Sequence, residues 1–133
     1  MYTYTIEKEK GLLGFETIPL QRMSDLTREL QTLEQKADQS IFSIVVNPPI
    51  NNVTSLMATV ATTSKGWFRK KKVKTVYGID LIVETVEGNQ TYYMGSFDTF
   101  KEFHRIFFDF FENQTLPDYT KENWTNETKS MLN

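Results

Sequence analysis

A long alternation of residue types in the middle of the chain restricts the fold more than any other feature. Every second residue from 73 to 85 is apolar, aromatic or β-branched, and these residues are Val73, Thr75, Tyr77, Ile79, Leu81, Val83 and Thr85. A repeat of two residues is typical of a strand with one buried face. The turn residues Glu87-Gly88-Asn89-Gln90 follow, and residues 91–94 begin a return strand. The sequence therefore predicts a long hairpin, which favours an antiparallel sheet.

Shorter strand-like segments precede this hairpin. They are the alternating residues 2–7, a weaker segment at 15–19, the β-branched run 41–46 and the Thr- and Ala-rich residues 56–64. A helix is expected between the second and third segments, over residues 24–37, with Ser24 as its N-cap. Leu26, Leu30 and Leu33 form an apolar stripe along one side of this helix.

A phenylalanine-rich segment after the return strand is expected to form a second helix, from Ser96 or Asp98 to about Asn113. The predicted order is β-β-α-β-β-β-β-α. We interpret it as an α+β domain in which a single antiparallel sheet packs on the C-terminal helix. We expect this domain to span residues 1–116. Residues 117–133 are expected to form a polar tail, with or without a short helix.

A strand pair that leads directly into a C-terminal amphipathic helix resembles the end of a pleckstrin-homology-type domain. The resemblance is confined to that strand pair and its helix. It implies an alternative fold, a barrel that is capped by the C-terminal helix. The helix expected at residues 24–37 departs from that pattern, so the single sheet is the first expectation.

The composition is that of a folded domain without disulfides. Hydrophobic residues make up 39% and charged residues 24% of the chain, which argues against disorder. The absence of cysteine excludes disulfides and thiolate metal sites. The first residues lack the basic and apolar regions of a signal peptide, and no apolar run is long enough to span a bilayer. We therefore expect a cytoplasmic protein, and the composition would suit a bacterial or phage source.

The sequence contains no motif of an enzyme or of a cofactor site. Phosphate-binding loops, dinucleotide-binding glycine motifs and the HExxH zinc motif are all missing. His104, the only histidine, has no second ligand at helical spacing. It is expected to be half-buried and hydrogen-bonded rather than a base or a metal ligand. Asp80 and Glu84 share a strand face but lie about 13 Å apart. We expect no catalytic residue, no metal, no cofactor and no small-molecule substrate.

A cationic segment interrupts the strand pattern at residues 65–74. It holds six positive charges and no negative ones, although the whole chain has a net charge of −2, so the rest of the chain is acidic. Its aromatic residues can stack on bases or enter a membrane interface while the cations neutralise phosphates. Alternatively, the lysines protect a strand edge from pairing with another chain. The candidate contacts for an anionic partner are Lys65, Trp67, Phe68, Arg69, Lys70, Lys71, Lys72 and Lys74.

The predicted C-terminal helix has a wide apolar face. Eight apolar residues lie within fifteen positions, and they are Phe97, Phe100, Phe103, Ile106, Phe107, Phe108, Phe110 and Phe111. They span about 200° of a helical wheel, whereas a helix on one sheet needs about 100° or a little more. Either the rest of the fold wraps around this helix, or part of the face binds a partner or a second copy of the chain. For the second case we assign Phe108, His104 and Phe111 to the interface.

The sequence thus predicts a non-enzymatic protein-binding module of the immunity, inhibitor, adaptor or assembly-factor type, which acts by covering a partner's surface. The expected partner is another protein or a second copy of the chain. The alternative function is binding of nucleic acid or an anionic membrane surface through residues 65–74. A third hypothesis, an enzyme that uses His104 with a carboxylate, has the least support.

Overall fold

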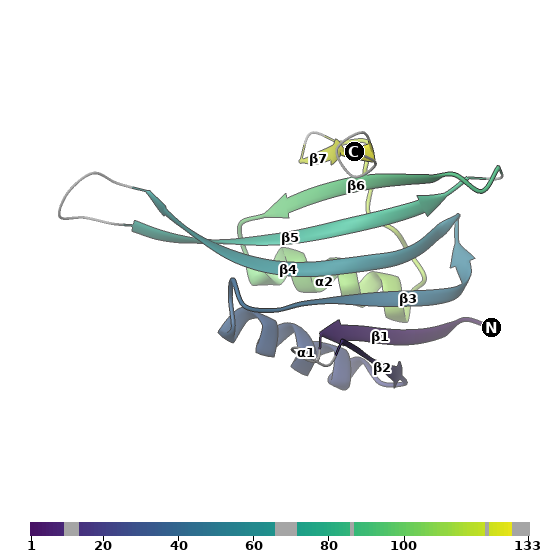
Figure 1. Ribbon diagram of the computed structural model, residues 1–133, viewed down its shortest axis with the longest axis horizontal. Helices are drawn as coiled ribbons and strands as arrows, with labels where there is room; N and C mark the ends of the chain where they lie inside the picture. The colour runs from purple at the N-terminus through teal and green to yellow at the C-terminus, as the bar shows by residue number, and fades with distance from the viewer. Residues whose placement is uncertain (10–13, 66–71, 86, 122, 129–133) are drawn as a thin grey trace.

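The computed structural model describes residues 1–9, 14–65, 72–85, 87–121 and 123–128, which form two layers. One layer is an antiparallel sheet, and the other consists of two helices that lie behind the sheet in Figure 1. The elements in chain order are β1 (Thr3–Glu9), β2 (Phe15–Leu20), α1 (Met23–Gln35), β3 (Ile41–Ile50), β4 (Val53–Lys65), β5 (Lys72–Glu84), β6 (Gln90–Phe97), α2 (Phe100–Glu112) and β7 (Trp124–Asn126). The predicted α+β class and single antiparallel sheet are confirmed.

The strands follow the order β2-β1-β3-β4-β5-β6-β7 across the sheet, and every neighbouring pair is antiparallel. The outermost strands β2 and β7 do not pair with each other. The sheet is therefore open, and the alternative of a helix-capped barrel is wrong. Pro19 lies in β2, which is an edge strand. Proline has no backbone N–H, and an edge strand tolerates it because one of its sides has no neighbouring strand to bond.

The register of the strands sorts their side chains onto two faces. Ile6, Ile44, Leu56 and Leu81 are direct neighbours across β1, β3, β4 and β5, and all of them are buried on the side that the helices cover. In β5 the alternation predicted from the sequence is confirmed, because Tyr77 is buried on the same side as Leu81. The residues between these positions form the opposite face of the sheet.

Helix α1 covers one part of the sheet with its leucine stripe. Leu26, Leu30 and Leu33 are buried, as their spacing predicts. The helix begins one residue before Ser24, and the extended residue Arg22 takes the N-cap position without a side-chain hydrogen bond. The prediction that Ser24 is the N-cap is therefore wrong, because its backbone already belongs to the helix.

Helix α2 begins later than expected, at Phe100, because β6 continues through Phe97. Thr99 is its N-cap. The Thr99 hydroxyl accepts a hydrogen bond from the backbone N–H of Glu102 at 3.2 Å and donates one to Glu102 Oε1 at 2.9 Å. The first of these bonds satisfies a backbone N–H at the start of the helix, as the N-cap residue of a capping box does.

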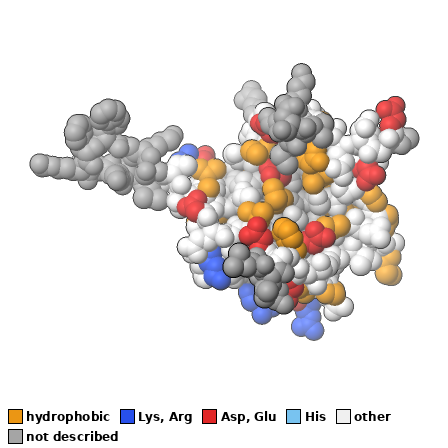
Figure 2. Space-filling model, in the orientation of Figure 1, with side chains coloured by type: hydrophobic (Ala, Val, Ile, Leu, Met, Phe, Trp, Pro, Cys, Tyr) orange, Lys and Arg blue, Asp and Glu red, His pale blue; other side chains and the backbone are white. Residues whose placement is uncertain are grey.

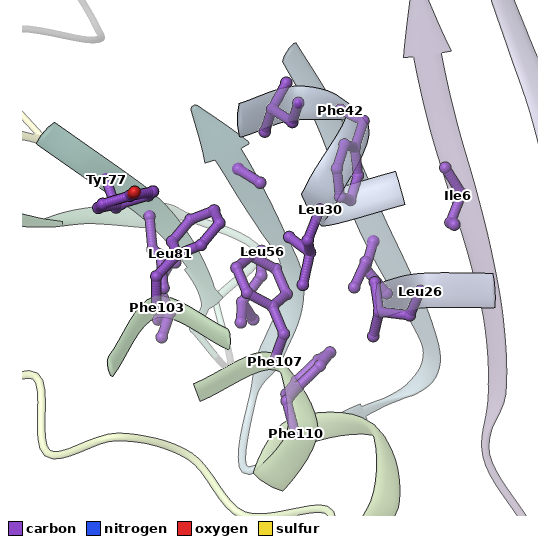
Figure 3. Packing of buried hydrophobic residues seen from close by; sticks show 14 of the residues in the cluster. Ile6, Leu26, Leu30, Phe42, Leu56, Tyr77, Leu81, Phe103, Phe107 and Phe110 are labelled. Atoms are coloured by element: carbon purple, nitrogen blue, oxygen red, sulfur yellow. The ribbon is translucent and has the colours of Figure 1, made fainter. Parts of the chain in front are cut away.

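The buried side of α2 is aromatic. Phe103, Phe107 and Phe110 are all fully buried. Figure 3 shows these rings between the helix and the sheet, near Leu56 of β4 and Leu30 of α1. Aromatic side chains of this size provide a large part of the buried apolar surface of a small core.

The C-terminal segment joins the sheet, which corrects the expectation of a polar tail or a short helix. Strand β7 pairs with β6, and Trp124 lies directly opposite Gly95. A Cβ atom at Gly95 would lie 2.7 Å from the Trp124 ring, so only glycine leaves room for it. Trp124 is 8% exposed and makes an edge contact with Phe97, with 5.7 Å between the ring centroids. The indole therefore anchors this end of the chain to the core.

Strands β4 and β5 extend beyond their neighbours. The β3 pairing of β4 ends at Thr59 and the β6 pairing of β5 ends at Tyr77, but β4 and β5 remain paired as far as Lys65 and Lys72. Residues 61–65 and 72–76 thus form a two-stranded arm, which projects to the left in Figure 1.

Candidate interaction surfaces

His104 lies in the contact between the two helices. Its Nε2 is hydrogen-bonded to the hydroxyl of Thr27 in α1 at 2.9 Å, and its ring stacks on Phe100 with centroids 5.6 Å apart. Burial lowers the pKa of the imidazole. These contacts fit the half-buried, hydrogen-bonded histidine that the sequence predicts. Among the described residues, no group of His, Asp and Glu side chains is arranged to hold a metal ion.

Phe111 and Phe108 have different environments, although both were assigned to the interface. Phe111 is half-buried against Tyr4 of β1, with 4.8 Å between ring centroids. The Tyr4 hydroxyl also donates a hydrogen bond to the backbone oxygen of Phe110 at 3.1 Å. β1 therefore covers one side of the wide apolar arc of α2, while α1 covers another.

Phe108 lies on the outer side of α2. Its ring is half-buried, and the guanidinium carbon of Arg105 lies 5.7 Å from the ring centroid. Phe108, Lys101, His104 and Arg105 line a shallow hollow on the helix surface. The structure thus brings His104 and Phe108 together at this hollow, and it places Phe111 against the sheet instead.

The predicted anionic-partner site falls largely outside the described residues. Residues 66–71, which include Trp67, Phe68 and three of the six cations, are not described. The neighbouring residues Lys65 and Lys72 are the last pair of the arm. Lys74, also in the arm, forms an ion pair with Asp98 in which Nζ lies 3.0 Å from Oδ1.

The side of the sheet opposite the helices is a surface that the sequence analysis missed. We call it the uncovered face. Its large apolar side chains from β3 to β6 are half-buried or exposed rather than fully buried, and they are Ile41, Val45, Met57, Val76, Ile82, Tyr92 and Met94. Figure 2 shows hydrophobic and acidic side chains intermixed on this face. An antiparallel sheet with one solvated face normally alternates cleanly between apolar and polar residues, and this one does not.

A signal for this face is present in the sequence. In residues 41–46 apolar side chains occupy both odd and even positions, and the same holds for residues 76–83 apart from Gly78 and Asp80. Such runs are typical of strands that are covered on both faces. The helices cover only one face of the sheet in the structure, so the second apolar set is left uncovered.

Asp80 occupies the middle of the uncovered face. It lies in β5 between Met57 of β4 and Met94 of β6, its direct neighbours in the register. The side chain is half-buried, and the pKa of its carboxyl is raised first by burial and then by the negative charge of Glu127. Neither the ion pairs nor the side-chain hydrogen bonds found among the described residues include Asp80.

The fold and this surface define a small two-layer α+β domain with one sheet face left open. Comparisons with protein-family models, with curated proteins and with solved structures find no match. In the part of the chain that the structure describes, no helix combines the length and the apolar character needed to cross a membrane. Function must therefore be argued from the chain's own surfaces.

Proposed function

We propose that the protein is a non-enzymatic, cytoplasmic binding module that covers a surface of another protein with the uncovered face of its sheet. The observation that carries this proposal is the set of seven partly exposed apolar side chains on that face. Contiguous apolar patches on a soluble domain are typical of sites for other proteins. An inhibitor, immunity, adaptor or assembly protein acts by covering such a surface and needs no chemistry of its own.

The rigidity of the sheet supports this proposal. The central strands β3, β4 and β5 are hydrogen-bonded on both sides, and their opposite face packs on two helices. A face held in this way loses little conformational freedom when a partner binds, which favours affinity. Met57 and Met94 add side chains that adapt to irregular partner surfaces.

The test compares two surfaces of the same protein. In the face variant, Val45→Ser and Ile82→Ser remove apolar contacts from the uncovered face. In the matched control, Phe108→Ser changes the hollow on α2. Wild type and both variants are immobilised and exposed to nuclease-treated lysate. Captured proteins are identified and purified, and their affinities are measured by calorimetry after circular dichroism has verified each fold.

We expect the face variant to bind a purified partner at least about tenfold more weakly than wild type, since two apolar anchors are lost. The control should bind like wild type. Loss of binding in Phe108→Ser alone would move the interface to α2. Equal binding by all three proteins would contradict a protein-binding role for the uncovered face.

The arm supports a second candidate function, binding of an anionic nucleic acid or membrane. Its described strands extend about 17 Å beyond the neighbouring strands, which exceeds the screening length of about 8 Å at physiological salt. The acidic body therefore repels an anionic partner only weakly at the end of the arm. Residues 65–74 would supply the positive charge.

Replacing Arg69, Lys70, Lys71 and Lys72 with serine tests this candidate. If four to five phosphate contacts form, the logarithm of the duplex DNA affinity should fall with the logarithm of salt concentration with a slope near −4. The quadruple variant should lose this binding and keep its melting temperature. Liposomes with and without anionic lipid separate a membrane from a nucleic acid. Binding that is insensitive to salt, or unchanged in the variant, would leave the lysines as edge protection.

A further inference from the structure

Outside the arm, the charge on the uncovered face has one sign. The strand register directs Glu7, Glu9, Asp80 and Glu84 toward this face. Outside the arm, none of the described strand residues on the same side is Lys or Arg, and Lys74, which lies in the arm, is paired with Asp98. An apolar surface that carries only carboxylates attracts cationic groups and repels anionic ones.

The position of Asp80 is unfavourable for the isolated domain. Its carboxylate lies between two methionines on a central strand, and Glu127 contributes a second negative charge nearby. A raised pKa means that the ionised carboxyl is less favourable in the folded chain than in the unfolded chain, so its charge lowers stability at neutral pH. A residue that breaks a rule of folding without a local compensation is a candidate for a functional role.

We infer that the partner of the uncovered face is a protein surface that presents a lysine or arginine surrounded by apolar side chains, and that this cation pairs with Asp80. The inference rests on the proposed function and adds the chemistry of the partner. Apolar side chains around the cation would pack on residues such as Met57, Ile82 and Met94. Burial of the pair between the two proteins would strengthen the interaction, because the protein interior screens charges less than water does.

The same charges argue against two other occupants. A second copy of the chain, docked face to face about a two-fold axis that passes near Asp80, would bring the Asp80 and Glu127 carboxylates of both copies together, and like charges across an interface are costly. A phosphate-bearing partner would meet the same repulsion.

A random-peptide library displayed on phage is the probe for this inference. The full-length wild-type protein is the bait, and Asp80→Lys is the counter-selection bait. Selected peptides are synthesised and titrated into wild type, Asp80→Asn, the face variant and Glu112→Gln. Glu112 is an exposed carboxylate on α2, so Glu112→Gln removes the same charge from the opposite layer. Asparagine matches the size of aspartate, and this variant is expected to fold because it removes an unfavourable charge.

We expect the selected peptides to combine Lys or Arg with apolar residues. Their affinity for Asp80→Asn should be about tenfold or more below that for wild type, because a charge-assisted hydrogen bond is lost. Their affinity for wild type should decrease as the salt concentration rises. Glu112→Gln should bind like wild type. Amide resonances of β4, β5 and β6 in a labelled sample should shift on titration.

Other results would overturn the inference in distinguishable ways. Peptides that need Val45 and Ile82 but ignore Asp80 and salt would overturn the cationic partner and keep the proposed function. Peptides that bind the face variant as well as wild type would overturn both. Selection of acidic peptides would overturn the inference directly. Self-association in light scattering that disappears in Asp80→Lys would identify a second copy as the occupant instead.

Discussion

Adjacent residues on α2 provide a sharp test of the core, because Phe107 is fully buried while Phe108 is only half-buried. The Phe107 ring packs against Phe103 and Phe42, with centroids 5.2 Å and 6.4 Å away. Phe107→Ala removes these contacts and leaves a cavity, which should lower the free energy of unfolding by about 3–5 kcal/mol. Phe108→Ala loses a partly hydrated ring and its contact with Arg105, so about 1 kcal/mol is expected.

Urea denaturation followed by circular dichroism measures both values, and thermal melts provide a second measure. For a domain of this size, the Phe107→Ala loss corresponds to a decrease in melting temperature of about 10 °C or more. Phe107→Leu is the matched control. It retains most of the side-chain volume and should cost about 1 kcal/mol. Equal and severe losses at Phe107 and Phe108 would refute the assignment of the buried and outer sides of α2. A loss below about 1.5 kcal/mol at Phe107 would refute the packing argument itself.

Three further predictions follow from the geometry. Asp80→Asn should raise the melting temperature at neutral pH, because burial raises the pKa of Asp80 and makes its charge unfavourable in the folded chain. Calorimetry at decreasing pH should show this gain vanish as the pH approaches 3.8, the ordinary pKa of aspartate. Gly95→Ala should displace the Trp124 ring and lower the free energy of unfolding by about 1–3 kcal/mol. In a Trp67→Phe background the fluorescence of Trp124 should shift to the red, and an unchanged spectrum would contradict the close approach of Gly95 and Trp124. His104→Gln should cost about 1 kcal/mol at neutral pH through the lost side-chain hydrogen bond. Because burial lowers the pKa of His104, wild type should lose stability as the pH falls below 6.5 and the variant should not; parallel pH profiles would contradict this.

Local patterns predicted most of the elements, because helix and strand periodicity is written in neighbouring residues. The stripe Leu26, Leu30 and Leu33 identified α1, and the alternation through Tyr77 and Leu81 identified β5. The helix ends were less accurate, since caps depend on backbone geometry. The spacing of Thr99 and Glu102, which is the sequence signature of a capping box, nevertheless indicates the start of α2.

The seventh strand could not be predicted from its own residues. A segment of three residues has no periodicity, and the polar residues around Trp124 are typical of a tail. Its place in the sheet depends on Gly95, which is distant in the sequence and has no side chain in the way of the indole. Tertiary contacts also separate two residues that the sequence pattern placed in one predicted interface. Phe108 and Phe111 are neighbours in the pattern, but Tyr4 of β1 covers only Phe111.

The sequence by itself determined the type of each main element, the antiparallel class and the aromatic side of α2, because these follow from spacing along the chain. Only the tertiary structure decided that both helices cover the same face of the sheet and leave the other face uncovered. Residues 41–46 and 76–83 carry apolar residues at odd and even positions alike, apart from Ser43, Gly78 and Asp80, so the sequence did not show whether a second layer covers the other face as well. Ile44 and Leu81 became core and Asp80 became surface because α1 and α2 pack on the same side, and this choice depends on contacts between residues far apart in the chain.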